Sequence, residues 1–289
     1  MNDGISVSDN GAAFVSFVER VLPTIESDIR DRLPHPYETS ETKSLSRYLY
    51  GPLERFVLSG GKRIRPALCL LGAVVVGAEE RVALSAACAV EMFQAAALIH
   101  DDIADKSEMR RGLPCLHRSE GTGVAINIGD VGIVDVAATV LHDTTLDRIN
   151  RMALFDEIYD MERQTLEGQA LDLGWARDGR WDIDEHDYLA MARLKTAHYS
   201  CATPLAMGAI CGNGTGEQIE TLRSFGLSCG LAFQIQDDLL NLVGDADAQG
   251  KDYRSDITEG KRTLVMVHAL GRLDSQDARE LEQDRKSVV

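Results

Sequence analysis

The sequence of 289 residues lacks features that would point to several classes of protein. It has no CxxC pair, and its six cysteines are scattered, mostly within apolar, alanine-rich runs. We interpret them as buried thiols in a reducing compartment rather than as disulfides or zinc ligands. The start, Met1-Asn2-Asp3-Gly4, lacks the basic residues and apolar run of a secretory signal. A cytoplasmic location is therefore expected.

Basic residues are also scarce. Lysine and arginine number 30 against 46 aspartates and glutamates, which gives a formal net charge of −16. An excess this acidic argues against nucleic-acid binding, because nucleic-acid-binding proteins usually carry a basic face. No stretch of about 18 apolar residues is free of charge, so no membrane span is expected. The sequence also contains no basic amphipathic segment that would indicate a stable membrane anchor.

No run of any length alternates between apolar and polar residues as a strand does, whereas apolar residues recur at helical spacing. The hydrophobic content of 44% supports a substantial core, and no Ser/Gly-rich linker divides the chain. The sequence therefore predicts a single all-α domain over residues 1–289. Helices are expected over residues 12–32, 41–58, 67–76, 82–105, 121–141, 150–173, 183–208, 215–243 and 264–270.

Two acidic clusters far apart in the chain hold the strongest chemical signal. Each follows an apolar run and places acidic or amide side chains at helical spacing on one face. Carboxylates that repel one another beside a core need cations to offset the cost. Facing clusters would form an oxygen-ligand site for Mg²⁺ shared with a phosphate ligand, with Mn²⁺ as a substitute. The aspartates concerned are Asp101, Asp102, Asp105, Asp237 and Asp238.

Basic side chains are concentrated where a diphosphate would need them. Lys62 and Arg65 follow a Gly-Gly turn, and Arg110 and Arg111 follow the first acidic cluster by one or two turns. Arginine forks pair bidentately with phosphate oxygens, and lysine adds a point charge. Lys195, in the middle of a helix with apolar neighbours, would be as readily structural if it stood alone. Acidic and basic groups together predict an enzyme of diphosphate chemistry.

Six segments together resemble the trans-isoprenyl diphosphate synthases, the polyprenyl synthetase family, and most of all its geranylgeranyl diphosphate synthases. They occur in the family's order and at its spacing, over about residues 40–270. The matching runs are Gly60-Gly61-Lys62-Arg63-Ile64-Arg65-Pro66, His100-Asp101-Asp102-Ile103-Ala104-Asp105 with Arg110-Arg111-Gly112, Ala125-Ile126-Asn127-Ile128-Gly129-Asp130, Lys195-Thr196-Ala197, Phe233-Gln234-Ile235-Gln236-Asp237-Asp238, and Gly250-Lys251 through Asp256 to Thr263.

The resemblance implies a helical bundle around a deep central cavity, a homodimer, and head-to-tail condensation of isopentenyl diphosphate with an allylic diphosphate. Mg²⁺ bound by the five aspartates would hold the allylic diphosphate. The implied isopentenyl diphosphate ligands are Lys62, Arg65, Arg111 and Gln94, and the further diphosphate ligands are Arg110, Lys195, Lys251 and Lys261.

The resemblance also assigns the catalytic groups. Asp101 and Asp237 would take part through the metal, whose charge offsets that of the leaving diphosphate as the allylic C–O bond ionises. The Lys195 carbonyl, the Thr196 hydroxyl and the Gln234 side chain would stabilise the allylic cation through their dipoles. No side-chain base is required, because in this family the released diphosphate is thought to take the proton.

In this family, product length follows the bulk beneath the first acidic cluster. Ala96 and Ala97, five and four residues before Asp101, are small, and the first large side chain is Phe93, one turn deeper. A helical turn rises about 5.4 Å, roughly one isoprene unit. The prediction is therefore a C20 product, geranylgeranyl diphosphate, with farnesyl (C15) and geranylfarnesyl (C25) diphosphates left open.

Two features depart from the family pattern. Asn241 stands where many members have the last aspartate of the second cluster, and the chain stops soon after the Lys261 motif, so a shortened C-terminus is expected. They leave open a non-catalytic subunit that binds and tunes another prenyl synthase. A class I terpene cyclase shares the first Asp motif, but it would not need an isopentenyl diphosphate site at Lys62, Arg65 and Arg111.

Overall fold

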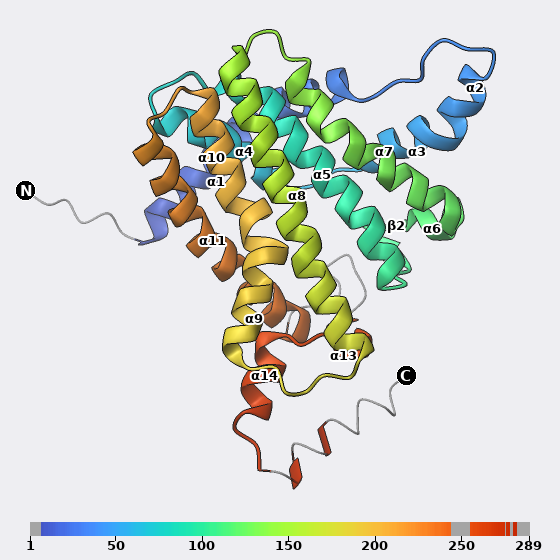
Figure 1. Cartoon of the computed structure of the whole chain (residues 1–289), viewed down its shortest axis with the longest axis vertical. Coiled ribbons are helices and arrows are strands. Elements are labelled where there is room, and N and C mark those ends of the chain that lie inside the picture. The colour runs from blue at the N-terminus through green and yellow to red at the C-terminus, as the bar shows by residue number, and fades with distance from the viewer. Residues whose placement is uncertain (1–6, 244–254, 275, 278–279, 282–289) are drawn as a thin grey trace, which may run out of the picture.

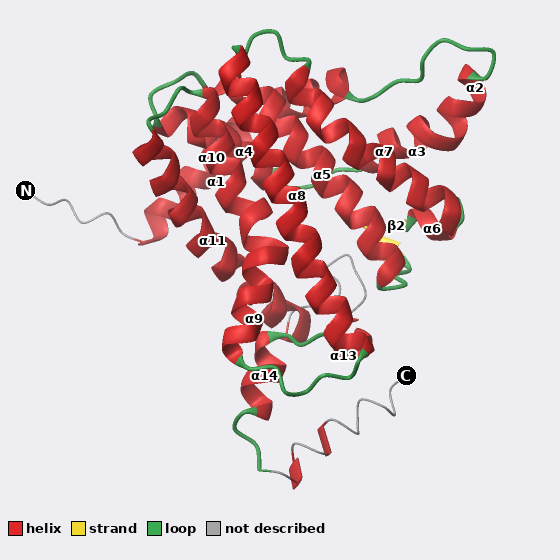
Figure 2. Ribbon diagram, viewed as in Figure 1, coloured by secondary structure: helices red, strands yellow, loops and turns green. Residues whose placement is uncertain are grey.

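The computed structural model describes residues 7–243, 255–274, 276–277 and 280–281. Helices make up nearly all of the regular structure (Figure 2). The one sheet in this part of the chain pairs two antiparallel strands of two residues each, β1 (Met109–Arg110) and β2 (Leu113–Pro114). The predicted all-α class is confirmed, and the long helices lie side by side around a buried centre (Figure 1).

Each expected helical range coincides with one or more helices of the structure. In chain order the helices of the described residues are α1 (Val7–Arg32), α2 (Thr42–Leu45), η1 (Ser46–Tyr50), α3 (Gly51–Val57), α4 (Ile64–Val75), η2 (Glu80–Ala83), α5 (Leu84–Ala104), α6 (Leu116–Ser119), α7 (Thr122–Leu141), α8 (Arg148–Arg177), α9 (Glu185–Ala192), η3 (Arg193–Ala202), α10 (Thr203–Cys211), α11 (Gly216–Val243), α13 (Ser255–Glu259) and α14 (Leu264–Leu270). The short helices α6 and α13 lie outside the expected ranges. The expected helix 183–208 is really three segments, because η3 is a π-helix inserted between α9 and α10.

Helix α5 runs through the core and delivers the first acidic cluster to its edge. It packs against α7, α4, α1 and α10, and its side chains from Ser85 to Ala96 are all buried. A helix that is apolar nearly all round is stable only when neighbours cover it on most sides. Each fully buried large side chain, such as Met92, contributes about 1.5–3 kcal/mol. The helix ends at Ala104, so Asp101 and Asp105 lie where the core opens.

The π-helix η3 is held between α8 and α11 by glycines. A Cβ on Gly168 of α8 would lie 2.2 Å from the backbone nitrogen of Lys195, and one on Gly226 or Gly230 of α11 would lie 2.6 Å from the η3 backbone. Because no side chain fits at these points, the three helices approach backbone to backbone. The short separation places Lys195 and Thr196 directly against α8 and α11.

A buried arginine holds the turn before α4. Arg63 has a left-handed backbone with φ of +47°, and its side chain is fully buried. Its Nε donates to Glu26 at 2.6 Å, its Nη2 donates to the Val57 carbonyl at 2.7 Å, and its Nη1 donates to Glu91. Two carboxylates and a carbonyl offset the cost of burying the charge. They fix the entry into α4 and therefore the position of Arg65.

Two helical stretches, Glu80–Ala104 and Thr122–Leu141, are long and apolar enough to cross a membrane by length and composition. The apolar window of the first is 78% buried, which identifies it as a core helix. The window of the second is only 39% buried. Neither stretch is free of charge, since Glu91 lies in the first and Asp130 and Asp135 lie in the second.

Helix α8 buries a carboxyl group that has no counter-charge among the described residues. The Oε1 of Glu162 is buried without a hydrogen-bond partner, and burial raises the pKa of Glu162 from 4.5 to about 7. Because the folded-state pKa lies above the unfolded one, the stability linked to this group is complete below about pH 4.5. It is lost as the pH rises through about 7.

We therefore expect Glu162→Gln to raise the melting temperature at pH 8 and to leave it nearly unchanged at pH 5. The gain at pH 8 should be about 1–2 kcal/mol after a discount for the partial exposure of the side chain. Thermal unfolding at the two pH values measures it. Asp156→Asn, an exposed change on the same helix, is the matched control. An equal shift at both pH values would contradict the assigned cause.

Candidate active site

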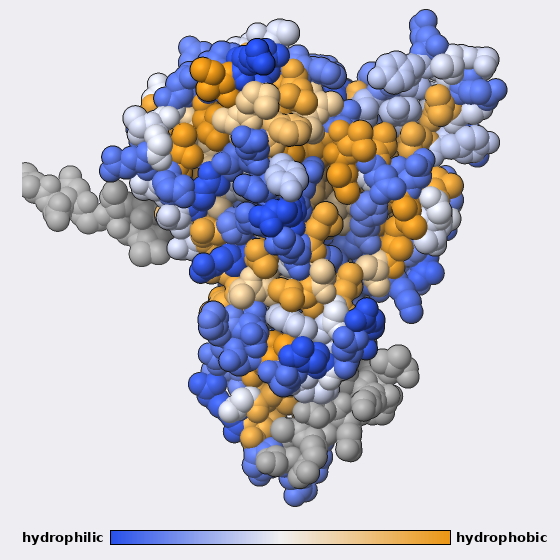
Figure 3. Space-filling view, viewed as in Figure 1, coloured by the Kyte–Doolittle hydropathy of each residue, from blue (hydrophilic) through white to orange (hydrophobic). Residues whose placement is uncertain are grey.

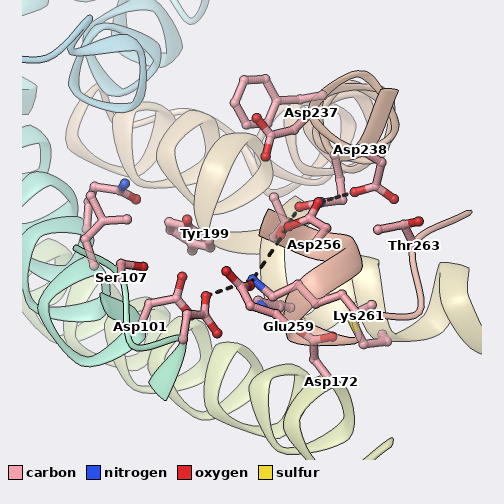
Figure 4. Close-up of a pocket in the computed structure, with 18 of the residues that line it drawn as sticks. Asp101, Ser107, Asp172, Tyr199, Asp237, Asp238, Asp256, Glu259, Lys261 and Thr263 are labelled. Atoms are coloured by element: carbon pink, nitrogen blue, oxygen red, sulfur yellow. Dashed lines mark hydrogen bonds and ion pairs between the residues drawn. The ribbon is translucent and has the colours of Figure 1, made fainter. Parts of the chain in front are cut away.

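A cavity of about 410 Å³ opens between α5, η3, α11 and the segment from α13 to α14 (Figure 4). Twelve of the residues predicted from the sequence line it: Arg65, Gln94, Asp101, Asp105, Arg110, Arg111, Lys195, Thr196, Gln234, Asp237, Asp238 and Lys261. Those placed elsewhere are Lys62, which is exposed, and Phe93, Ala96, Ala97 and Asp102. Lys251 lies outside the described residues.

The two neighbouring aspartates of the first cluster point in different directions. Asp101 faces the cavity, where its Oδ1 accepts a hydrogen bond from Gln169 Nε2 at 2.9 Å. Asp102 is 1% exposed and accepts a hydrogen bond from Arg110 Nε at 2.9 Å. A charge-assisted pair of this kind orients the arginine side chain. In this structure Asp102 therefore serves Arg110 rather than lining the cavity.

The pKa values of Asp101 and Asp105 are shifted in opposite directions. Burial raises the pKa of Asp101, but the charges of Lys195 and Lys261 outweigh it, so this pKa is lowered overall. Burial and the nearby Asp101 raise the pKa of Asp105 to about 6. The ammonium group of Lys261 lies 2.8 Å from Asp105 and 2.6 Å from Glu259 (Figure 4). Its charge offsets part of the repulsion between the carboxylates.

The second cluster is divided in the same way. Asp237 lines the cavity and is partly exposed. Asp238 also borders the cavity, but it is 5% exposed and accepts three hydrogen bonds: from Tyr188 Oη at 2.7 Å, from Leu264 N at 3.0 Å and from Gln234 Nε2 at 2.8 Å. A carboxylate with three donors is a structural anchor. Asp238 thus ties α11 to α9 and to the start of α14.

The π-helix contributes two of the predicted catalytic groups, Lys195 and Thr196, and each is paired with a side chain of a neighbouring helix. Thr196 Oγ1 donates to Gln234 Oε1 at 2.6 Å, which orients both side chains. Lys195 forms an ion pair with Asp172 of α8. Burial lowers the pKa of Lys195, but Asp172 and Asp101 outweigh this effect and raise it overall. Lys195 is therefore held in its charged form at the cavity wall.

Several residues of the cavity wall, and Gln169 beside it, were not predicted from the sequence. Asp172 and the hydrogen-bond donor Gln169 share a face of α8, and their spacing of three residues was the available signal. Asp256 and Glu259 precede Lys261 in a segment that matched the family, but no role was assigned to them. The apolar part of the wall, also unassigned, consists of Leu98, Met191, Tyr199 and Phe233.

Tyr199 connects the apolar wall to Arg65. Arg65 Nη2 donates to Tyr199 Oη at 3.1 Å and to Ser200 Oγ at 2.7 Å, and the guanidinium lies 4.6 Å from the centre of the Tyr199 ring. The Phe93 ring meets the Tyr199 ring edge-on, with centres 5.7 Å apart. Phe93 is therefore behind Tyr199. Ala96 lies against α7, where a Cβ on Gly132 would be 3.1 Å from its own Cβ.

A tight hairpin aims the two arginines that follow α5. Arg111 and Gly112 at its turn have φ angles of 53° and 75°, which suit glycine best. The hairpin directs Arg110 toward Asp102. It directs Arg111 toward the turn after α3, where Nη1 donates to Ser59 Oγ at 3.3 Å. Each arginine thus reaches the cavity from the same short loop but at a different point.

The donor set fits a hard cation shared with a ligand. No group of three or more His, Cys, Asp or Glu within the described ranges is placed to hold a metal ion by itself. The acidic side chains that face the cavity offer only oxygen atoms, and Lys195 and Lys261 border the same space. Oxygen ligands from few carboxylates, completed by substrate phosphates, are the usual environment of Mg²⁺.

Comparison with known proteins identifies the family. The family model for polyprenyl synthetase matches residues 46–287. A short chain isoprenyl diphosphate synthase of Methanothermobacter thermautotrophicus is 39% identical over 228 residues, which are 79% of this chain and 69% of that protein. The chain therefore belongs to the polyprenyl synthetase family of trans-prenyltransferases.

Other relatives carry names for two product lengths. A geranylfarnesyl diphosphate synthase of Natronomonas pharaonis is 36% identical over 242 residues, covering 78% of this chain and 68% of that protein. A geranylgeranyl diphosphate synthase of Methanosarcina mazei is 34% identical over 253 residues, covering 86% of this chain and 76% of that protein.

Solved structures agree with the fold. The geranylgeranyl pyrophosphate synthetase of Pyrococcus horikoshii matches with a TM-score of 0.84 and 30% identity, over 96% of this chain and 83% of that one. The geranylgeranyl pyrophosphate synthase of Corynebacterium glutamicum, complexed with isoprenyl diphosphate and magnesium, matches with a TM-score of 0.76 and 30% identity, over 96% of this chain and 82% of that one. The predicted fold and family are confirmed.

Proposed function

We propose that this prenyltransferase condenses isopentenyl diphosphate with an allylic diphosphate to make geranylgeranyl diphosphate, and that it uses Mg²⁺. The observation that supports this most strongly is a single cavity with Asp101 and Asp105 on one side and Asp237 on the other. Part of its wall is apolar, with Leu98 and Tyr199. A charged mouth over an apolar wall suits a molecule with a diphosphate head and a prenyl tail.

In this proposal, Asp101, Asp105 and Asp237 hold Mg²⁺ together with the allylic diphosphate. The metal, when bound, neutralises charge that develops on the leaving diphosphate. The ammonium groups of Lys195 and Lys261 act on the same charge from the cavity wall, where they need no rearrangement during the reaction. We assign Asp102 and Asp238 to positioning, because the first holds Arg110 and the second holds the start of α14.

The allylic C–O bond breaks first, and the leaving diphosphate takes the bonding electrons. Gln234 Oε1 and the Thr196 hydroxyl, oriented by their mutual hydrogen bond, direct dipoles toward the resulting cation. The alkene of isopentenyl diphosphate then attacks this cation, which forms the new C–C bond and leaves a tertiary cation. Loss of a proton from C2 to the released diphosphate restores a double bond. We assign Arg65 and Arg111 to the isopentenyl diphosphate, together with Gln94 and the exposed Lys62. Arg65 Nε is buried without a partner among the described residues, which leaves a donor for phosphate.

We also propose a homodimer that forms through α7 and α8, with the protein in the cytoplasm. Exposed apolar side chains on α8 recur at intervals of seven residues, at Met152, Tyr159, Leu166 and Leu173. Val134 of α7 is 74% exposed. A stripe with this period is typical of one helix packing along another. The space-filling view shows apolar side chains near α7 and along α8, between polar ones (Figure 3).

Activity tests the proposal directly. Purified protein would receive Mg²⁺, isopentenyl diphosphate and, separately, dimethylallyl, geranyl and farnesyl diphosphates, with the products sized by mass after dephosphorylation. We expect a dominant C20 alcohol. Asp101→Asn and Asp237→Asn should each lower the turnover about 10²–10³-fold, because each removes a metal ligand charge without changing shape. Asp160→Asn, on the exposed side of α8, should change little. A folded protein that elongates no primer would favour the non-catalytic subunit.

Product length tests the depth of the cavity. Phe93→Ala should add C25 product to C20, since removal of the ring behind Tyr199 lets that wall move outward. The size distribution of the alcohols measures it. Phe225→Ala, an exposed position on α11, is the control. An unchanged distribution would show that Phe93 is not the floor.

Assembly is tested by mass in solution. Leu166→Glu would place a charge in the middle of the proposed contact and should shift the protein from dimer to monomer in light scattering coupled to gel filtration. Phe225→Glu introduces the same charge at an exposed apolar position of α11 and should leave the mass unchanged. A wild-type monomer, or a dimer that tolerates Leu166→Glu, would refute this interface.

A further inference from the structure

The segment from α13 to α14, residues 255–270, forms one wall of the cavity and carries, besides Arg262, three of its charged groups. These are Asp256, Glu259 and Lys261. Lys261 reaches Asp105 across the cavity at 2.8 Å and lies 3.8 Å from Asp256 (Figure 4). The charges can act on a diphosphate only while this segment, here called the closing segment, stays in place. What holds it is therefore part of how the site works.

The residue next to Lys261 is attached to a different part of the fold. Arg262 is 2% exposed, and its guanidinium carbon lies 3.8 Å from the centre of the Trp181 ring. Its nitrogens donate to the backbone carbonyls of Trp175, at 3.3 Å, and of Arg180 and Gly260. A guanidinium stacked on an indole and bonded to several carbonyls is held in one orientation.

Apart from Gly260, the partners of Arg262 lie at the C-terminal end of α8 and just beyond it. Trp175 belongs to the last turn of α8, which ends at Arg177. Carbonyls at a helix C-terminus lack helical partners and carry the negative end of the helix dipole, so a cation is favoured there. Arg262 thus binds the closing segment to backbone carbonyls at and after the end of α8 and to the ring of Trp181.

A second anchor lies two residues further along. The backbone nitrogen of Leu264 donates to Asp238 at 3.0 Å, and Asp238 also accepts from Tyr188. Asp238 therefore holds the start of α14 against α11, while Arg262 holds the preceding turn against α8. Lys261 immediately precedes the first anchor. Its backbone has little freedom while both contacts persist.

We propose that Arg262 and Trp181 form a latch that positions the closing segment, so that Asp256, Glu259 and Lys261 meet the allylic diphosphate and its metal. The assignment rests on the proposed function for the identity of that ligand. Both latch residues are positioning residues, since they act through the backbone of their neighbours. The isopentenyl diphosphate groups, Arg65 and Arg111, lie on α4 and the hairpin and do not depend on the latch.

The first test needs no substrate. Hydrogen–deuterium exchange would be compared for wild type, Arg262→Gln and Trp181→Leu. Both variants should exchange faster over residues 255–270 and 175–183, at least about threefold, with no change in α4 or α5. Unchanged α5 exchange also shows that the variant is folded. Arg180→Gln is the matched control: its exposed side chain pairs with Asp182, while its backbone carbonyl remains available to Arg262. Unchanged exchange in both variants would overturn the latch.

Ligand binding separates positioning from general stability. Titration calorimetry with inorganic pyrophosphate and Mg²⁺ should show about tenfold weaker binding for Arg262→Gln and Trp181→Leu. Trp181→Phe, which keeps an aromatic face, should restore most of the affinity. In steady-state kinetics the KM for the allylic diphosphate should rise about tenfold while that for isopentenyl diphosphate stays within twofold. Equal rises in both would contradict the proposal. A wild type that binds pyrophosphate but makes no product would refute the proposed function and leave the latch standing.

Discussion

The constraint on which this structure depends is electrostatic repulsion, because several carboxylates face one cavity and repel one another. In each acidic helix one aspartate is held by partners of its own: Asp102 binds Arg110, and Asp238 receives three hydrogen bonds. The carboxylates left facing the cavity are offset by Lys195 and Lys261. The cavity therefore presents both carboxylates and ammonium groups. In the proposed function, the metal would pair with the carboxylates and the diphosphate with the ammonium groups, and both sets of charges are already in place.

Close helix packing fixes the positions of these charged and polar groups. The glycines of α8 and α11 bring η3 within backbone contact of both helices, so Lys195 can pair with Asp172 while Thr196 pairs with Gln234. A methyl group at Gly168 or Gly230 would force the helices apart. Displacements of about 1 Å are enough to weaken catalysis strongly when groups must be preorganised. Gly168, Gly226 and Gly230 thus help to set where the charged residues of the site lie.

The sequence allowed prediction of the fold and of most of the cavity, because helical periodicity and aspartate clusters are local signals. It did not reveal that residues 193–202 form a π-helix, since the apolar pattern there also fits an α-helix. Nor did it show which member of each aspartate pair faces the cavity. Asp101 and Asp102 are neighbours with the same chemistry, and only Arg110, brought back by a hairpin turn, distinguishes them. Asp172 escaped notice because its partner, Lys195, is distant in sequence.

Two buried arginines complete the account of how the charged loops are held. Arg63 and Arg262 each stand beside a lysine in the sequence, Lys62 or Lys261, and each binds backbone carbonyls of another part of the fold. Arginine suits this task because its planar fork satisfies several acceptors at once and stays charged when buried. Lysine, a point charge on a flexible stem, suits the neighbouring position, which the proposed function assigns to phosphate binding. Under that proposal, the arginine of each loop supplies the anchor and the lysine supplies the ligand, so exchanging the two residues would lose both.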